Sequence, residues 1–367
     1  MRSAMGGGIV CYVSGHGFGH ASRVCEVLRA LRARRPDVAL AVRSPLPRWF
    51  FDHSLGGDFA HAECRLDVGA VQADSLAVDI DATAAAYAAI EARRDELIAA
   101  EVAALAGQRP RVLLADIPAL AFDIAAALAI PGVGMTNFSW DWIYADYAAE
   151  QPAFVPLVAA LRRSYGRATV LCRLPLYGDL SAFPCIRDVP LVARRAVLAG
   201  DEVRRRLALP REGRLVLLSF GGLGLSLDAA PALPGVSFVS TAGAAVGSAG
   251  PRGCRVLAGD DLQRAGVRYE DLVGAADAVV TKPGYGIVAE CIANRTAIVY
   301  TARGRFAEYP CLVAGIEAHL AHAFLANDDL RAGRWAEALE RAWSMPMPPP
   351  VPIDGAAVVA ERLDALL

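Results

Sequence analysis

Two histidines and three glycines are concentrated close to the start of the chain. The segment reads Ser14-Gly15-His16-Gly17-Phe18-Gly19-His20, and it lies between an apolar run and an amphipathic stretch that begins near Ala21. Glycine lets backbone amides approach a ligand closely, and the free amides of a helix N-terminus favour an anion. Histidine accepts a proton near neutral pH, so either His16 or His20 could act as a general base. We therefore expect an anion-handling turn that carries its own base.

A general base needs a partner that orients it, and Asp116 is the candidate for His20. Asp116 follows the apolar run Val112–Ala115, so parallel strands would bring it to the sheet edge where the glycine turn lies. Its carboxylate could accept the other ring N–H, which fixes the tautomer and stabilises an imidazolium formed in a reaction. The alternative is that Asp116 caps the helix that follows. A dinucleotide site is disfavoured, because His20 stands where G-x-G-x-x-G requires its third glycine.

A second glycine turn lies in the other half of the chain, at Thr281-Lys282-Pro283-Gly284-Tyr285-Gly286. Lys282 is the single lysine among 37 basic residues, and its ammonium is a compact charge on a flexible stem. Gly284 and Gly286 can present free amides to a phosphate as a helix begins. Glu290 comes one helical turn after Gly286, where it could bind the vicinal hydroxyls of a ribose. An exposed helix glutamate is the alternative.

Two further segments could complete a ligand site in this half. Gly221 and Gly222 follow the predicted strand Leu215–Phe220 and could form a facing wall. Glu308 lies in a loop with two arginines, where these side chains could meet sugar hydroxyls or phosphate. A solvated loop is the alternative for Glu308.

An aromatic-rich segment follows the predicted strand Val133–Thr136, in a chain that is only 7% aromatic. It could form a wall for an acceptor through Asn137, Trp140 and Asp141, although some of its rings must pack in the core. A D-x-D pair at 79–81 lacks a strand-end context, so we expect no metal site there.

Short apolar runs alternate with helical periodicity along the whole chain, a pattern typical of parallel sheets with helix crossovers. Strands are predicted at Ile9–Val13, Val38–Val42, Val112–Ala115, Val133–Thr136, Leu215–Phe220, Val236–Ser240, Arg255–Leu257, Ala278–Thr281 and Thr296–Tyr300. A long alanine-rich helical region is predicted at 82–106, and shorter helices near 269–276, 286–294 and 310–318.

The pattern restarts after a charged stretch at 195–212, which predicts two domains. We expect an N-terminal α/β domain at 1–195, a C-terminal one at 196–345, and a proline-rich linker with a final helix at 346–367. Two such domains would turn the carboxyl ends of both sheets towards one cleft, the usual ligand site in such sheets.

Composition narrows the function classes. The 367 residues suffice for two domains of about 150–200 residues each. A formal net charge of −2 provides no basic field for nucleic acid or an anionic membrane. Eight scattered cysteines without a C-x-x-C pair indicate neither a zinc site nor a disulfide framework. Charges and prolines interrupt the most apolar window, and the first residues lack an apolar leader, so we expect a cytoplasmic protein without a membrane segment.

With both turns placed, the chain resembles the GT-B class of glycosyltransferases, in which two Rossmann-like parallel-sheet domains face each other across a cleft. Within that class it resembles the glycosyltransferase-like N-terminal half of plant L-arabinokinases and their free-standing bacterial relatives. The blocks that carry the resemblance span most of the chain: Tyr12–Arg23, Asp67–Asp74, Thr136–Asp141, Phe220–Gly222 and Gly284–Gly286. The sugar-kinase half has no counterpart here, so the resemblance does not imply kinase activity.

The resemblance also implies roles for single residues. His20 occupies the place of the catalytic base in GT-B enzymes, and Asp116 that of the acid that supports it. Thr281–Glu290 resembles the donor-binding loop and helix, with the loop near the diphosphate and Glu290 on the ribose. Glu308 lies where that class contacts the donor sugar, followed by a tyrosine instead of the usual glutamine.

The leading hypothesis is a metal-independent, inverting glycosyltransferase. It would move a sugar from a nucleotide diphosphate donor, UDP-linked, to a hydroxyl group of a small-molecule acceptor, with no cofactor beyond the donor itself. Two alternatives stay open: a nucleotide-sugar hydrolase or epimerase with the same donor site, and a non-catalytic subunit that binds a sugar nucleotide.

Overall fold

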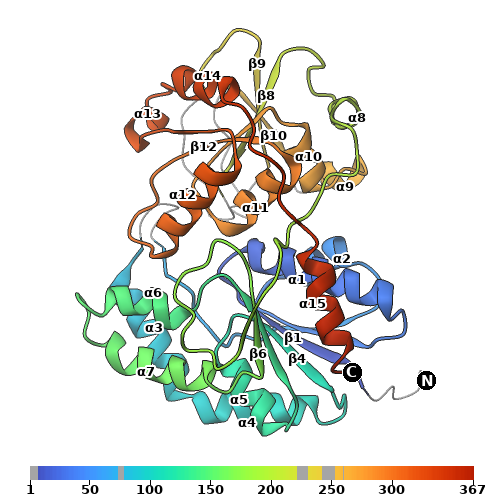
Figure 1. Cartoon of the computed structure of the whole chain (residues 1–367), viewed down its shortest axis with the longest axis vertical. Helices are drawn as coiled ribbons and strands as arrows, with labels where there is room; N and C mark the ends of the chain where they lie inside the picture. Colours follow the sequence, from blue (N-terminus) through green and yellow to red (C-terminus); the bar gives the residue numbers. More distant parts are fainter. Residues whose placement is uncertain (1–6, 73–77, 221–229, 242–252, 259) are drawn as a thin grey trace. The chain divides into compact units, whose positions relative to one another are not determined.

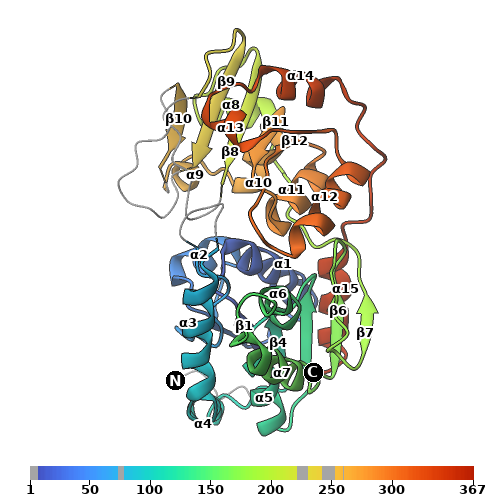
Figure 2. The same cartoon turned by 90° about the vertical axis from the view of Figure 1, so that its left-hand side faces the viewer.

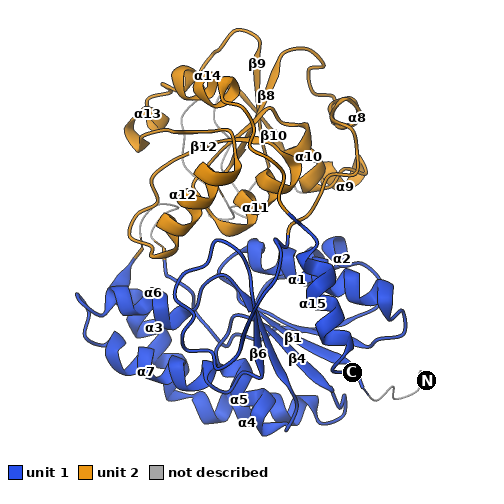
Figure 3. Cartoon of the chain, viewed as in Figure 1, with its two compact units in different colours: residues 1–71, 79–192, 352–367 blue, residues 72–78, 193–351 orange. Residues whose placement is uncertain are grey.

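The computed structural model describes residues 7–72, 78–220, 230–241, 253–258 and 260–367. The chain forms two compact units (Figure 3). Unit 1 comprises Met1–Val71, Asp79–Val192 and Pro352–Leu367, and unit 2 comprises Gln72–Val78 and Ala193–Val351. The final helix, which the sequence analysis left apart from both domains, therefore belongs to unit 1.

Unit 1 is built on a parallel sheet in the order β3-β2-β1-β4-β5-β6-β7. Figure 1 labels β1, β4 and β6 of this sheet. Its strands are β1 Ile9–Val13, β2 Leu40–Arg43, β3 Ala60–Ala62, β4 Val112–Asp116, β5 Gly132–Thr136, β6 Val170–Arg173 and β7 Ile186–Asp188. Its helices are α1 Phe18–Arg34, α2 Arg48–Ser54, α3 Ile80–Ala92, α4 Arg94–Leu105, α5 Leu120–Ala127, α6 Trp140–Tyr147, α7 Phe154–Tyr165 and α15 Gly355–Asp364. Every residue of β1, β4 and β5 is buried, as a sheet covered on both faces requires.

Unit 2 repeats this plan with a parallel sheet in the order β10-β9-β8-β11-β12-β13 (Figure 2). Its strands are β8 Arg214–Ser219, β9 Val236–Thr241, β10 Cys254–Leu257, β11 Ala278–Thr281, β12 Ala297–Tyr300 and β13 His322–Phe324. Its helices are α8 Gly200–Arg206, α9 Asp261–Arg264, α10 Tyr269–Ala275, α11 Tyr285–Asn294, α12 Glu308–His319, α13 Asn327–Arg331 and α14 Ala336–Ser344. The α/β class and the two parallel sheets that the sequence predicted are confirmed.

Each sheet has one point at which the direction of its crossovers reverses. In unit 1 the chain passes from β1 through α1 to β2, but from β4 through α5 to β5 on the other side. Because such crossovers are right-handed, the two helices cover opposite faces, and the loops after β1 and β4 diverge at the carboxyl ends of the strands. In unit 2 the same reversal separates β8 from β11. These two edges are where the topology favours a ligand site.

Two helix predictions are corrected by the structure. The long region at 82–106 is two helices that meet at Arg93, so that α3 packs against α7 and α4 against α5. The first helix begins at Phe18 rather than near Ala21, with Gly17 as its N-cap at φ 154°, a conformation that favours glycine. His20 therefore lies in the first turn of α1.

The cysteines of the described residues are all free thiols. Four of them are fully buried: Cys11, Cys25, Cys172 and Cys291. The other four are half-buried, so the buried cysteines serve as small apolar side chains.

Helix α15 packs against α1, although the two lie at opposite ends of the sequence. The chain leaves unit 1 after Val192 and returns to it at Pro352. These two junctions are hydrogen-bonded to each other, because Leu191 N–H donates to Pro352 O at 3.3 Å and Gly355 N–H donates to Leu191 O at 3.2 Å. Val359, Ala360 and Leu363 are fully buried in α15. Unit 1 is thus completed by the last residues of the chain.

We expect Leu363→Ala to lower the free energy of unfolding by about 2–5 kcal/mol, because it leaves a cavity beneath α15. Leu366→Ala is the matched control, since Leu366 is only half-buried and its truncation should cost clearly less. Urea denaturation of both variants measures the difference. Equal losses for the two would contradict the placement of α15.

Candidate active site

The first cluster of functional side chains lies at the crossover reversal of unit 1. His20 and Arg23 come from the first two turns of α1, which follows β1, and Asp116 is the last residue of β4. Strands β1 and β4 are direct neighbours, with Val13 opposite Asp116 in the register. Two segments almost a hundred residues apart in sequence are thereby brought together, as the sequence analysis expected for His20 and Asp116.

The three side chains form a buried hydrogen-bonded cluster. His20 is 7% exposed, Arg23 3% and Asp116 0%. His20 Nδ1 lies 2.9 Å from Asp116 Oδ1. Arg23 donates two hydrogen bonds to the same carboxylate, from Nε to Oδ2 at 2.5 Å and from Nη2 to Oδ1 at 2.7 Å. Asp116 contacts side chains from α1 instead of capping its own helix, which begins only at Leu120.

Electrostatics keeps this carboxylate ionised. Burial alone would raise the pKa of Asp116, but the charges of Arg23 and His20 and their hydrogen bonds outweigh it, so the net shift lowers the pKa. An ionised carboxylate at Nδ1 leaves Nε2 as the ring nitrogen that can accept a proton. This arrangement has the components of a base-catalysed reaction at a hydroxyl group.

His16 has a different environment from His20. The backbone N–H of Ala70 donates to His16 Nδ1 at 3.2 Å, and the ring of Trp140 lies edge-on at 5.1 Å between centroids. An imidazole that accepts at Nδ1 carries its proton on Nε2 when neutral. His16 therefore presents a donor at Nε2, and Gly69, at φ 73°, leaves the room that the His16 ring occupies.

A second buried carboxylate, Asp67, lies beneath the glycine turn. Trp140 Nε1 donates to Asp67 Oδ2 at 2.9 Å, and Asp67 is 2% exposed. Burial raises its pKa, against the lowering effect of hydrogen bonds from Ser14 and Trp140. Asp67 begins one of the blocks that carry the family resemblance, but no role was predicted for it.

The residues predicted to form an acceptor wall are buried. Trp140 is 0% exposed and packs on Phe138 and Tyr144, so its ring supports the turn instead of offering a stacking surface. Asn137 is also 0% exposed, and its Oδ1 accepts from Arg23 Nη1 at 2.8 Å. Asp141 is 2% exposed and pairs with Arg162 at 3.1 Å. An aromatic run at a strand end also satisfies the packing needs of a parallel sheet, and the role of these three residues in acceptor binding stays a prediction.

The second cluster lies at the crossover reversal of unit 2. Strand β11 ends at Thr281 opposite Ser219 of β8, and the loop to α11 carries Lys282. Gly284 is the N-cap of α11, so the amides of Tyr285 and Gly286 lie in its first turn, where backbone N–H groups have no helical partner. Lys282 is half-buried next to these amides in sequence. This combination suits a phosphate group.

Glu290 lies on the second turn of α11 and forms an ion pair with an arginine that was not predicted to lie there. Arg194 Nε donates to Glu290 Oε1 at 2.6 Å, and Arg194 also pairs with Glu270 at 3.3 Å. Glu290 is 4% exposed. A ribose would therefore meet Glu290 as one partner of an ion pair.

Glu308 begins α12 and is 3% exposed. Its carboxylate lies 3.2 Å from Arg303 Nη1, and the same nitrogen donates to Pro283 O at 3.1 Å. Arg303 thus connects Glu308 to the glycine turn of unit 2. Gly221 and Gly222, predicted to form the facing wall, lie outside the described residues.

A metal cluster and a membrane-spanning helix each place requirements on the described residues. No group of three or more His, Cys, Asp or Glu side chains is placed there to hold a metal ion. Asp79 of the D-x-D pair is the N-cap of α3, accepting from Ala82 N at 2.9 Å. No helix in this part of the chain is long and apolar enough to cross a membrane.

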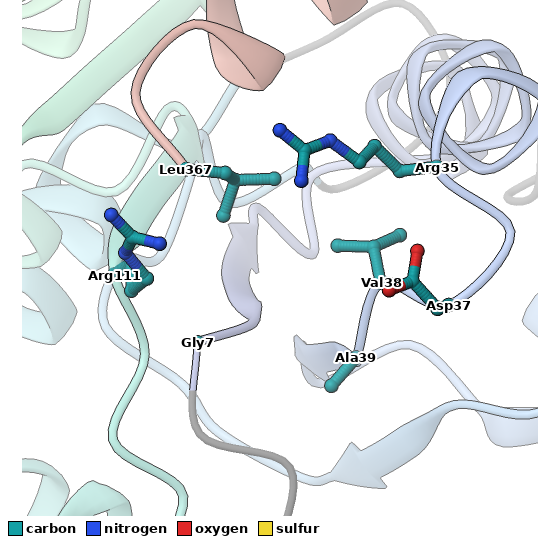
Figure 4. A pocket seen from close by; sticks show the side chains of 7 residues that line it. All are labelled: Gly7, Arg35, Asp37, Val38, Ala39, Arg111 and Leu367. Carbon is teal, nitrogen blue, oxygen red and sulfur yellow. The ribbon is translucent and has the colours of Figure 1, made fainter.

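Unit 1 also contains a small pocket, and Figure 4 shows the side chains that line it. Its lining comes from residues that precede β1, β2 and β4 and from the end of the chain: Gly7, Arg35, Asp37, Val38, Ala39, Arg111 and Leu367. It therefore lies at the amino ends of the strands and is separate from the candidate active site.

Known proteins with similar structures identify the fold. A calicheamicin glycosyltransferase superimposes with a TM-score of 0.58 and 16% identity over 100% of this chain and 99% of its own. A kitacinnamycin glycotransferase has a TM-score of 0.56 and 19% identity over 99% and 94%. A UDP-glucosyltransferase from Polygonum tinctorium has a TM-score of 0.57 and 13% identity over 100% and 99%. The chain has the GT-B glycosyltransferase fold.

Sequence comparison adds a specific relative. The chain is 33% identical over 338 residues to an L-arabinokinase from Arabidopsis thaliana. This match covers 91% of the chain but 32% of that protein, so the chain spans about a third of its relative's length. No protein-family model matches the chain.

Proposed function

We propose that the chain is a glycosyltransferase that moves a sugar from a UDP-linked donor to a hydroxyl group of a small molecule, with inversion and without a metal. The observation that carries this proposal is the contact of His20 with an ionised, buried Asp116 at the sheet edge of unit 1. A base held in this way suits the activation of an alcohol, which is a poor nucleophile while it keeps its proton.

In the proposed reaction, His20 Nε2 takes the proton of the acceptor hydroxyl as the oxygen bonds to the anomeric carbon of the donor sugar. The bond from that carbon to the diphosphate oxygen breaks, and the nucleoside diphosphate leaves with the electron pair. A single displacement of this kind inverts the configuration. Asp116 stabilises the imidazolium that forms, while Lys282 and the N-terminus of α11 stabilise the charge on the leaving diphosphate.

The choice of UDP is supported by two lines of argument. Unit 2 presents a lysine, helix amides and a buried carboxylate near one strand end, which suit a diphosphate and a ribose. A structural neighbour, a glycosyltransferase from Arabidopsis thaliana with a TM-score of 0.57 and 13% identity, was solved with UDP. The kinase activity named for the sequence relative is not carried over to this chain, which spans a third of that protein.

A thermal-shift screen against nucleotides and nucleotide sugars tests the donor class. Binding to the native state raises the melting temperature by mass action, so UDP and UDP-sugars should stabilise the protein. Stabilisation by UDP with release of free sugar in the absence of an acceptor would favour a hydrolase. Binding without turnover of any donor would favour a sugar-nucleotide-binding subunit, and the absence of any nucleotide effect would contradict all three.

Because the chain has a single lysine, acylation of Lys282 can report on the proposed donor site. In this chain an acylating reagent can modify only Lys282 and the α-amino group among the aliphatic amines. We expect UDP to slow acylation of Lys282 by at least about tenfold at saturation, while the α-amino group reacts at an unchanged rate as the internal control. Peptide mass spectrometry measures both rates. Equal protection of both amines, or of neither, would place the nucleotide elsewhere.

A further inference from the structure

Arg23 makes several hydrogen bonds within the candidate active site, although the sequence predicted no role for it. Besides its two bonds to Asp116, its guanidinium donates to Asn137 Oδ1 at 2.8 Å and to Thr136 Oγ1 at 3.3 Å. Asn137 and Thr136 belong to the end of β5, next to β4 in the sheet. Arg23 therefore connects α1 to the ends of two neighbouring strands.

A planar guanidinium fixes the direction of its partners, not only their charge. Nε and Nη2 bind the two oxygens of Asp116 as a fork, which holds the plane of the carboxylate. With that plane held, Oδ1 lies 2.9 Å from His20 Nδ1. A side chain with a single ammonium could supply the charge but could not hold both oxygens.

The cluster also determines which ring nitrogen of His20 carries the proton. Arg23 Nη2 lies 3.1 Å from His20 Nδ1, so Nδ1 could in principle accept from Arg23 or donate to Asp116. An unprotonated Nδ1 would direct its lone pair at an ionised carboxylate oxygen, which is repulsive. The two hydrogens of Nη2 already have oxygen acceptors in Asp116 and Thr136. Nδ1 therefore donates to Asp116, and Nε2 is unprotonated in the neutral ring.

We propose that Arg23 is a positioning residue of the active site: it fixes the carboxylate of Asp116 so that His20 is held in the Nδ1–H tautomer with Nε2 available as the base. This inference rests on the proposed function for its catalytic meaning. The charged and titratable groups around His20 are Asp116 from β4, Arg23 from α1 and the more distant Asp67. Without Arg23, both nearby carboxyl groups would favour an extra proton on the His20–Asp116 pair, and that proton would block Nε2.

The first test reads the protonation of His20 directly. The chain contains six histidines, so ¹⁵N spectra of the imidazole rings are simple, and a His20→Asn variant assigns the relevant signals. In the unmodified protein at alkaline pH we expect the Nδ1–H tautomer for His20 and the Nε2–H tautomer for His16. In Arg23→Met, the midpoint of the His20 ring titration should move to higher pH by about one to three units, the usual effect of one nearby charge.

The second test reads turnover with the donor found in the thermal-shift screen. Arg23→Met should lose about 10- to 100-fold in kcat at neutral pH, with an unchanged KM for the donor and partial recovery at alkaline pH. Arg94→Met is the matched control, because Arg94 holds Asp123 and Ser164 in the same unit but not the candidate site. It should lower stability without moving the His20 titration.

Several outcomes would overturn this role. An Nε2–H tautomer of His20 in the unmodified protein would do so, as would an unchanged His20 midpoint in folded Arg23→Met. If Arg23→Met does not fold, Arg23→Lys replaces it, with a smaller upward shift expected because the charge is kept and the fork is lost. A protein that turns over no donor would contradict the proposed function, whereas the ring spectra would still decide the role of Arg23.

Discussion

His20→Ala should lower kcat by about 10²–10⁴-fold while leaving UDP binding intact. In the proposed reaction the imidazole takes the acceptor proton, and the surrounding cluster cannot replace it. Arg23 has no lone pair to offer, and Asp116 is fully buried with both oxygens held by Arg23. Steady-state kinetics with saturating donor measures the loss, and the thermal shift with UDP shows that unit 2 is unaffected.

His53→Ala is the control for this variant. His53 is an exposed residue of α2, within the same unit but on another helix than His20 and Arg23. It should retain turnover close to that of the unmodified protein. Near-normal kcat in His20→Ala would remove His20 from the chemistry and with it the proposed mechanism.

Unlike His20→Ala, Asp116→Ala should lower the free energy of unfolding as well as the turnover. It leaves the Arg23 guanidinium buried at 3% exposure without its carboxylate. Breaking a buried ion pair from one side costs about 3–5 kcal/mol, since the remaining charge stays in a poorly solvating environment. Turnover of the folded fraction should also fall by about 10²–10⁴-fold, because nothing then fixes the tautomer of His20.

Two comparisons isolate the cause of that loss. The double variant Asp116→Ala with Arg23→Met should unfold at a higher urea concentration than Asp116→Ala alone, because it leaves no unpaired charge. Asp123→Ala also removes a buried aspartate, but its partners Arg94 and Arg167 are 22% and 58% exposed and can be hydrated. Its cost should be smaller and its kcat unchanged. A double variant less stable than Asp116→Ala would contradict the charge argument.

The sequence predicted the strands well where a run of apolar residues coincides with a strand that is buried in the sheet. Largely apolar runs such as Ile9–Val13 and Ala278–Thr281 are strands with the predicted bounds, because buried parallel strands need nearly continuous apolar residues. The short strands β3, β6, β7 and β13 were not predicted. Their sequences are brief and mixed, and they are defined by pairing with a neighbour rather than by their own residues.

The candidate site was predicted in part. His20 and Asp116 were found because a glycine turn and a strand end are both visible in the sequence. Arg23 was missed, although it lies on the same helical stripe as His20, Val24 and Val27, all of them buried. A charged residue on an otherwise buried stripe indicates a buried partner, which was the available signal. No comparable signal marks Arg194, because its contact with Glu290 depends on tertiary folding.

The hydrogen bonds that join Leu191 to Pro352 and Gly355 have a consequence for how this architecture can be varied. Residues 193–351 of unit 2 are joined to unit 1 through neighbouring residues, and the short segment Gln72–Val78 is the other part of unit 2. Replacing 193–351 with its counterpart from another chain would therefore require two nearby junctions and an inserted segment that is compatible with Gln72–Val78. If the proposed function holds, such an exchange would alter the donor site while His20 and Asp116 stay in place.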